Sequence, residues 1–313
     1  MPKRWESLDE FRGFAMAALI LFSPLFLFDC IPDWVKHANG NGLHLVDLGV
    51  PAFLFAVGLS YKISFDKKRL SITTIKLIRS FLSRNLVLII FGLVGEPLRY
   101  GDWKLHWGVL ETIGACGIFV LPFMFLRHEI RLALALIMPF LWQLLLSSGY
   151  ENLASVYDMG GPFSVPAWSS IILLGSVVFD ISTTKDRVRI IPDLVFTSVE
   201  AFLLTVIFVI MGAPINKHLV TLSYVAIGIA FSSFVFAAFV FKEKNKLQFA
   251  WLSAFGKNSL LMYILAGFEF LLIERVFPPS LSLGYVIIVA ICSLFICFPI
   301  AWALSKKRIY LKL

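Results

Sequence analysis

The sequence has little charge for its length and few of the groups that a metal centre needs. Only 15% of its 313 residues are Asp, Glu, Lys or Arg, and it holds four cysteines. A soluble protein of this length carries more charge than this on its surface. The cysteines show no spacing typical of a metal site, so we expect no metal. These scarcities exclude soluble two-domain enzymes and metal-cluster proteins as classes.

Apolar residues fill the chain instead. They make up 59% of it, including 31 Phe, and the mean hydropathy is +0.85. A helix crosses a bilayer with about 20 apolar residues. About ten segments meet this measure, namely 11–31, 43–65, 80–98, 107–126, 130–148, 166–182, 191–213, 219–241, 248–274 and 282–305. The sequence therefore predicts an all-α integral membrane protein, a bundle of about ten transmembrane helices. No repeat or linker interrupts it, which predicts a single domain over residues 1–313.

The positive charges indicate how the chain is oriented. The net charge is +8, and Lys and Arg gather between alternate spans, at 3–12, 67–84, 127–131, 185–189, 242–246 and 306–312. Cytoplasmic loops of membrane proteins carry such an excess. Both termini are therefore predicted to be cytoplasmic, and the basic residues need no nucleic acid to explain them. The same topology places His37 on the opposite side, in the loop after the first span.

One segment carries ionisable groups where lipid-facing sequence does not tolerate them. Residues 36–60 read KHANGNGLHLVDLGVPAFLFAVGLS, in which His37 and a turn rich in Asn and Gly precede Asp47 at the mouth of a span. An ionisable residue in the membrane is by default a hypothesis for a functional site. Asp47 is suited to orient the His37 ring for proton transfer. Two plainer interpretations stay open: His37 is a loop histidine at a wet interface, and Asp47 pairs with a Lys or Arg of another span.

Further polar residues have both a structural and a functional interpretation. In SLDEFRG, Ser7 and Glu10 fit a helix-capping box, whereas Arg12 is a candidate to meet a phosphate in an inner cavity. Pro51 breaks the backbone pattern of its span, which supports an outer polar pocket that Glu111 joins. Two further carboxylates, Glu200 and Glu269, either belong to the pocket or form hydrogen bonds between helices.

With these residues, essentially the whole chain resembles the heparan-α-glucosaminide N-acetyltransferase family. Six motifs in order carry the resemblance: SLDEFRG (7–13), KHANGNGLHLVDLGVPAFLFAVG (36–58), GVLETIG (108–114), PINKHLVTLSYV (214–225), GKNSLLMY (256–263) and KKRIYLKL (306–313). In this comparison the family's catalytic histidine falls on His37 and its following aspartate on Asp47.

The resemblance implies a membrane acetyltransferase. Its donor would be cytosolic acetyl-CoA, and its acceptor an amine or hydroxyl of a sugar or glycan on the extracytoplasmic side. His37 would act as general base or carry the acetyl group, with Asp47 orienting it and Ser23 or Asn41 assisting. The candidate donor-binding residues are Arg12, Lys62, Lys257 and Asn258. The candidate acceptor-side residues are Asn41, His44 and Glu111.

The chain also departs from the family's pattern. An asparagine of the first span falls on Ser23, and a Gln-Arg pair falls on Glu111 and Thr112. Because such changes gather on the outer side, we expect the donor to be retained and the acceptor to differ. The short N-terminus suggests a bacterial inner-membrane protein, and a homodimer stays open. Two alternatives remain: a transporter of small amino sugars that uses the same polar cavity, and a scaffold that has lost its chemistry.

Overall fold

The structure is a computed structural model, and it describes residues 5–101, 106–184 and 187–310. Within these ranges the chain forms helices and no strand. Four basic residues used to predict the orientation, Lys3, Arg4, Lys185 and Lys312, lie outside the described residues, as do the last three residues of the KKRIYLKL motif.

The helices follow one another along the chain with short connections. The α-helices are α1 (Glu6–Phe22), α2 (Gly49–Arg69), α3 (Thr74–Tyr100), α4 (Val109–Val120), α5 (His128–Leu145), α6 (Glu151–Ala154), α7 (Val165–Thr184), α8 (Ile191–Ile210), α9 (Leu222–Lys244), α10 (Ala250–Lys257), α11 (Ser259–Val276) and α12 (Leu283–Lys306). Shorter turns are η1 (Ser23–Leu27), η2 (Asp33–Val35), η3 (Leu45–Leu48), η4 (Pro122–Phe125), η5 (Leu146–Tyr150), η6 (Pro162–Ser164) and η7 (Arg187–Ile190).

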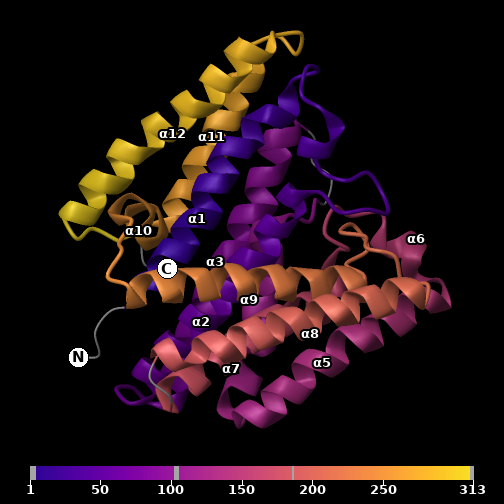
Figure 1. The fold of residues 1–313 in the computed structure, drawn as a ribbon, viewed down its shortest axis with the longest axis vertical. Coiled ribbons are helices and arrows are strands. Elements are labelled where there is room, and N and C mark those ends of the chain that lie inside the picture. The colour runs from indigo at the N-terminus through magenta and orange to yellow at the C-terminus, as the bar shows by residue number, and fades with distance from the viewer. Residues whose placement is uncertain (1–4, 102–105, 185–186, 311–313) are drawn as a thin grey trace. The chain divides into compact units, whose positions relative to one another are not determined.

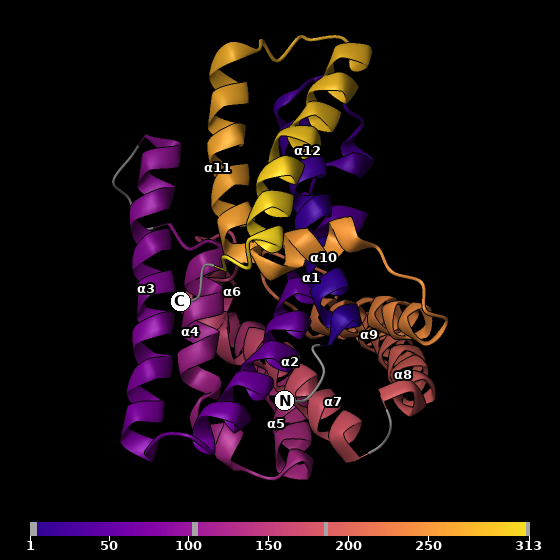
Figure 2. The same cartoon turned by 90° about the vertical axis from the view of Figure 1, so that its left-hand side faces the viewer.

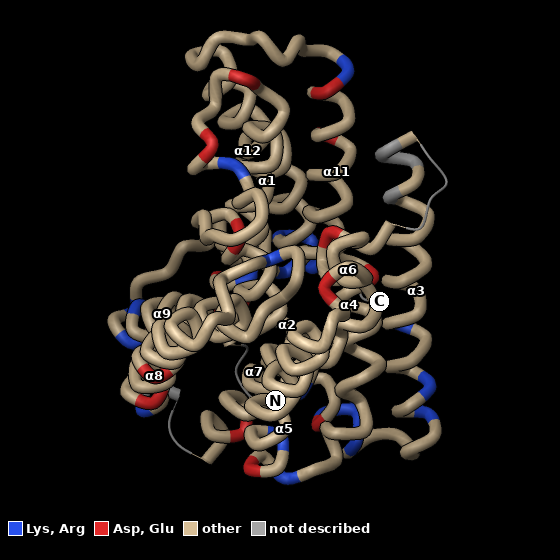
Figure 3. Tube along the Cα trace, turned by 90° about the vertical axis from the view of Figure 1, so that its right-hand side faces the viewer, with Lys and Arg blue, Asp and Glu red and all other residues tan. Residues whose placement is uncertain are grey.

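Many of these helices are long and apolar enough to cross a membrane. Among the described residues, eight segments meet that description: Glu6–Leu27, Leu45–Arg69, Thr74–Gly95, His128–Ala154, Pro162–Thr184, Ile191–Ile210, Leu222–Lys244 and Leu283–Lys306. In Figure 3 the tube of α12 is tan along most of its length, because its only charged residue is Lys306. The chain is thus an all-α polytopic membrane protein, as predicted. The count of about ten spans and the cytoplasmic termini stay predictions.

Two predicted spans take a different form in the structure. The segment 107–126 holds only the 12-residue helix α4, because Pro122 begins the separate turn η4. The segment 248–274 is divided into α10 and α11 at Asn258, whose backbone (φ −124°, ψ 37°) is not helical. Averaged hydropathy cannot register either break, since one polar or Pro residue changes the mean very little.

The fold consists of two compact units, which are described separately. Unit 1 comprises Met1–Ala38, His44–Gly49 and Val235–Lys312, and unit 2 comprises Asn39–Leu43 and Val50–Phe234. The single domain predicted over 1–313 stays a prediction beside this division.

Unit 1 is built on α1. Gly13 and Gly256 let α1 and α10 approach closely: a Cβ on Gly256 would lie 1.8 Å from the Asp9 carbonyl oxygen, and one on Gly13 would lie 1.8 Å from that of Leu252. Small residues permit such approach between membrane helices. Figure 1 shows α11 and α12 running beside each other in the same unit. Together these helices hold η1 and the polar loop that follows it.

Unit 2 packs by the same device. A Cβ on Gly58 of α2 would lie 2.2 Å from the Ile172 carbonyl oxygen of α7, and one on Gly175 of α7 would lie 2.4 Å from the Phe55 carbonyl oxygen of α2. Figure 2 shows α3 and α4 side by side, and Tyr61 of α2 donates a 2.6 Å hydrogen bond to the Gly117 carbonyl of α4. The helices α2 and α7 of this unit therefore cross with their backbones close together, where a side chain larger than that of glycine does not fit.

Candidate functional site

The structure brings His37 and Asp47 together within unit 1. The Nδ1 atom of His37 lies 2.7 Å from Oδ1 of Asp47. Asp47 is 1% exposed, whereas the His37 side chain is 39% exposed. The turn η2 ends just before His37, the turn η3 contains Asp47, and the two turns contact each other, which brings the two residues together. A buried carboxylate therefore faces an imidazole that remains accessible.

The second oxygen of Asp47 is held by the backbone. Its Oδ2 accepts hydrogen bonds from the N–H groups of Ala38 (3.3 Å) and His44 (3.0 Å). These donors fix the carboxylate, so it can fix the ring in turn. A carboxylate acceptor keeps the proton of a neutral imidazole on Nδ1, and the lone pair then lies on Nε2. The arrangement suits Nε2 to accept a proton from a nucleophile or to act as a nucleophile itself.

An aromatic ring covers part of the imidazole. The ring of Phe26 in η1 lies 4.7 Å from the ring of His37 at an interplanar angle of 48°. Ser23 begins the same turn, and its N–H bonds to the Leu19 carbonyl as the C-cap of α1. The predicted helper Ser23 thus lies one turn along the chain from the residue that packs on His37.

The predicted acceptor-side residues His44 and Asn41 take part in building the loop. The Nδ1 atom of His44 lies 2.8 Å from the Lys36 carbonyl oxygen, which ties the two sides of the loop in unit 1. In unit 2, Oδ1 of Asn41 accepts a 2.9 Å hydrogen bond from Nδ2 of Asn216. Gly40, which directly precedes Asn41, has φ +81°, a value that an L-residue rarely adopts. Both predicted residues therefore have structural contacts of their own.

Glu111, the third predicted acceptor-side residue, lies at the start of α4 in unit 2. Its side chain is 0% exposed, and Oε2 accepts a 3.2 Å hydrogen bond from the Gly108 N–H. A Cβ on Gly92 of α3 would lie 2.2 Å from its carboxyl carbon. This is the position of a helix-capping carboxylate, packed between two helices.

On the donor side, the structure joins two of the motifs that carry the resemblance. Nη2 of Arg12, from SLDEFRG, lies 2.6 Å from Oγ of Ser259, from GKNSLLMY. Asn258 is 2% exposed, and its side-chain amide donates a 3.2 Å hydrogen bond to the Ile309 carbonyl. Gly256, two residues before Asn258, allows the close approach of α1 and α10 in this region. Arg12 and Asn258 are therefore brought together in unit 1.

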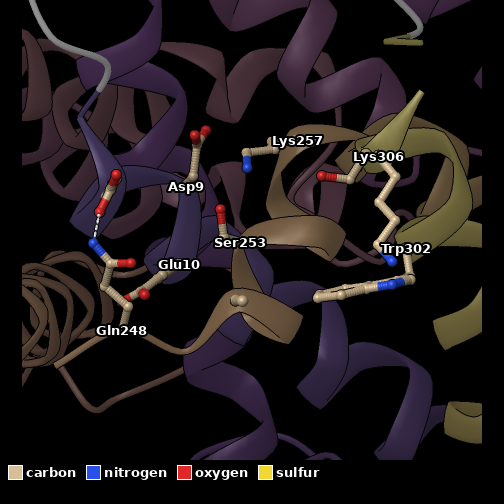
Figure 4. A pocket seen from close by; sticks show the side chains of 10 residues that line it. Asp9, Glu10, Gln248, Ser253, Lys257, Trp302 and Lys306 are labelled. Atoms are coloured by element: carbon tan, nitrogen blue, oxygen red, sulfur yellow. Dashed lines mark hydrogen bonds between the residues drawn. The ribbon is translucent and has the colours of Figure 1, made fainter. Parts of the chain in front are cut away.

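Lys257 lines a cavity of about 330 Å³ in the same unit. The other lining residues are Glu6, Asp9, Glu10, Gln248, Ala250, Ser253, Trp302, Ser305 and Lys306. Figure 4 shows Lys257 and Asp9 among the side chains that line the cavity. The Lys306 ammonium lies 5.4 Å from the centre of the Trp302 ring. The cavity thus offers two ammonium groups and one indole beside three carboxylates.

Lys62, the remaining predicted donor-binding residue, lies in an ion-pair cluster of unit 2. Its Nζ is 2.5 Å from Oδ1 of Asp66 and 3.5 Å from Oδ1 of Asp180. Arg131 of α5 also pairs with Asp180, and it donates a 2.5 Å hydrogen bond to Oγ of Ser176. Lys62 is 7% exposed and Arg131 is 0% exposed. The two cations and two carboxylates neutralise one another and tie α2, α5 and α7 together.

Comparison with known proteins places the sequence in a family. Residues 4–192, more than half of the chain, match the family model described as the catalytic region of heparan-alpha-glucosaminide N-acetyltransferase. The chain belongs to this family. Human heparan-alpha-glucosaminide N-acetyltransferase is 29% identical over 122 residues, which cover 36% of this chain and 18% of the human protein. The resemblance inferred from the six motifs is therefore confirmed.

The family match covers most of the candidate residues but not all of them. It includes His37, Asp47 and Arg12, and it ends before Lys257 and Asn258. The contact between Arg12 and Ser259 accordingly joins the matched region to the part of the chain beyond it. Sequence reasoning missed Phe26 and Trp302. Ser259 could have been predicted, because it follows Asn258 in the motif GKNSLLMY.

Proposed function

We propose that this member of the family transfers the acetyl group of cytosolic acetyl-CoA to an amine or hydroxyl of a sugar or glycan on the far side of a bacterial inner membrane. His37 is the proposed general base or acyl carrier. The single observation that carries the proposal is the 2.7 Å contact between His37 and the buried Asp47. Family membership supports the reaction class, because the matching model describes an N-acetyltransferase.

The chemistry assigned to His37 follows from its contacts. With an amine acceptor, the nitrogen attacks the thioester carbonyl while Nε2 of His37 takes the amine proton. The carbon–sulfur bond breaks, and the CoA sulfur leaves as a thiol once it receives that proton. In the two-step route Nε2 attacks the thioester, and the acceptor then displaces it from the acetyl group. In both routes Asp47 stabilises the imidazole while it carries positive charge.

The donor side has suitable groups in the same unit. Arg12, Lys257 and Lys306 are cations for the phosphates of acetyl-CoA, and a planar guanidinium suits a phosphate best. Arg12 lies in α1 and Ser23 is the C-cap of that helix, eleven positions further on, so the two are separated by about 17 Å along the helix axis. An extended pantetheine arm reaches that far. Lys62 is the weakest member of the proposed donor set, because Asp66 and Asp180 already balance its charge.

The acceptor side is the less specific part of the proposal. Asn41 lies in the Gly-rich turn and His44 follows it, and Ser23 is the only hydroxyl in the turn that also carries Phe26. Glu111 is kept as an acceptor-side residue, although its contact with the Gly108 N–H also explains its burial. An amino sugar is the simplest acceptor that presents both an amine and hydroxyls.

A transfer experiment in proteoliposomes tests the proposal. Purified protein is reconstituted with glucosamine enclosed, and acetyl-CoA is added outside. We expect N-acetylglucosamine to form inside the vesicles, and we expect acetyl-CoA to raise the thermal unfolding temperature of the purified protein. The release of free CoA outside should match the product in amount.

Two other results would overturn the proposal in distinct ways. Labelled glucosamine that crosses the membrane unmodified without acetyl-CoA would identify a transporter. If no product forms, no sugar crosses the membrane and acetyl-CoA does not stabilise the protein, the chain is a scaffold without chemistry.

A further inference from the structure

The loop that carries His37 also presents a large aromatic ring at the surface of unit 1. Trp34 lies in η2, three residues before His37, and at 71% it is the most exposed Trp of the described residues. Three residues of chain extend no further than about 11 Å, which limits the distance between the two Cα atoms. Within the described residues, Trp34 makes no hydrogen bond or ring contact. Its ring is therefore open to a ligand close to the proposed catalytic residue.

The turn that carries Trp34 is firmly held by its neighbours. Val35, the next residue, packs against the buried cluster that includes Phe28. The Lys36 N–H donates a 3.0 Å hydrogen bond to the Asp33 carbonyl, which closes the turn. Successive side chains of such a turn point about 120° apart, so packing of Val35 directs Trp34 away from the core. A ligand that meets this ring does not have to order the loop first.

A second exposed apolar side chain lies on the turn that contains Asp47. Leu45 is the first residue of η3 and is 65% exposed. Because η3 contacts η2, the two turns that bring His37 and Asp47 together each present one large apolar side chain. Single exposed apolar residues are ordinary, whereas a group of them marks a place of contact with a ligand, another molecule or lipid. Their position beside His37 favours a ligand of the reaction.

A pyranose ring matches these side chains in its chemistry. The face of an equatorially substituted sugar consists of C–H bonds, whose hydrogens are slightly positive, and the face of an indole is slightly negative, so the two attract when they stack. A Trp side chain also offers a large contact area with only two rotatable bonds, which keeps the entropic cost of binding low. The hydroxyls at the edge of the sugar stay in water. A stacked sugar therefore buries apolar surface without losing the hydration of its polar groups.

We propose that Trp34 is the platform on which the acceptor sugar stacks, with Leu45 beside it, so that the sugar amine is presented to Nε2 of His37. This inference rests on the proposed function. It makes Trp34 a binding residue that takes no part in proton transfer, and it assigns the choice of acceptor to a ring contact. A pyranose amine is therefore favoured over an acyclic amine.

Steady-state kinetics of purified protein test this choice with two acceptors, glucosamine and the acyclic amine ethanolamine. Trp34→Ala should raise the KM for glucosamine about tenfold, as loss of one stacked ring predicts, and Trp34→Phe should raise it about threefold. Neither variant should change the kcat, the KM for acetyl-CoA or the kinetics with ethanolamine. Trp251→Ala, which removes a 44% exposed Trp of α10 in the same unit, is the control and should match the wild type.

Saturation-transfer NMR with glucosamine, without acetyl-CoA, measures binding apart from catalysis. We expect the strongest transfer at the C–H protons of one sugar face, with loss in Trp34→Ala and retention in Trp34→Phe. This pattern in a wild type that transfers no acetyl group would support the platform and contradict the proposed function. Unchanged KM for glucosamine and unchanged saturation transfer in Trp34→Ala would overturn the platform, as expected for a Trp among lipid headgroups. An equal rise in KM for both amines would overturn it as well.

Discussion

Asp47 of unit 1 and Asp180 of unit 2 are carboxylates in contact with nitrogen-bearing side chains, but they are held in different ways. Asp180 contacts the cations Arg131 and Lys62, so charge is neutralised by opposite charge. Asp47 is held by two backbone N–H groups and contacts an imidazole that is 39% exposed. In the first arrangement, the positive charges are already neutralised by carboxylates. In the second, the carboxylate contacts the Nδ1 atom of the ring rather than Nε2, which is why we propose catalysis at His37 and Asp47.

The largest expected effect comes from removing the charge of Asp47 while keeping its shape. Asp47→Asn retains an oxygen for the backbone N–H groups, but its amide can stabilise the wrong tautomer of His37. We expect the rate of acetyl transfer to glucosamine to fall by about 10²–10⁴-fold. Asp33→Asn, at the start of η2, is the matched control and should retain the rate. An Asp47→Asn protein with the wild-type rate would contradict a catalytic role for Asp47 that Asp180 lacks.

The corresponding change in the other region should affect stability instead. Arg131→Met keeps the aliphatic volume but leaves Asp180 with Lys62 alone. Loss of one partner from a buried pair costs several kcal/mol, and we expect about 3 kcal/mol because Asp180 is partly exposed. Thermal unfolding in detergent measures this, with Arg127→Met, an 80% exposed side chain, as control. The rate per folded molecule should be retained, and a specific loss of rate would give the cluster a part in the chemistry.

A smaller effect is expected where the two donor-side motifs meet. Gly256→Ala places a methyl group 1.8 Å from the Asp9 carbonyl oxygen, so α1 and α10 must separate. We expect about 1–3 kcal/mol of destabilisation, as for other overpacked contacts. Gly267→Ala in α11 is the control, because its Cβ would meet nothing within 4 Å. That variant should be slightly stabilised, by about 0.5–1 kcal/mol. Equal unfolding temperatures for the two variants would contradict the close packing.

The sequence was a good guide where the physics is local. Long apolar runs predict membrane helices because the bilayer sets their length, and eight such helices are present in the described part of the chain. His37 and Asp47 were predicted as partners, and they are close because only a short loop separates them. The Asn258 break was missed for the opposite reason: one backbone conformation ends a helix without changing average hydropathy.

Contacts between distant segments were out of reach of the sequence. Lys62 was predicted to bind the donor, but it contacts Asp180, which is 118 residues away by the difference of their numbers. No local sequence pattern predicts an ion pair between residues so far apart in the chain. Glu111 was predicted for the acceptor pocket, and its capping contact with Gly108 also fits the motif GVLETIG. Phe26 gave no signal at all, because an aromatic ring in an apolar span is ordinary.

The most direct test of the proposed catalytic role is acetyl transfer by purified His37→Ala protein. It is compared with the wild type and with His128→Ala, which removes a half-exposed histidine at the start of α5. We predict that His37→Ala loses transfer by at least about 10²-fold, while acetyl-CoA still raises its unfolding temperature and His128→Ala transfers normally. Transfer by His37→Ala at the wild-type rate would contradict the account.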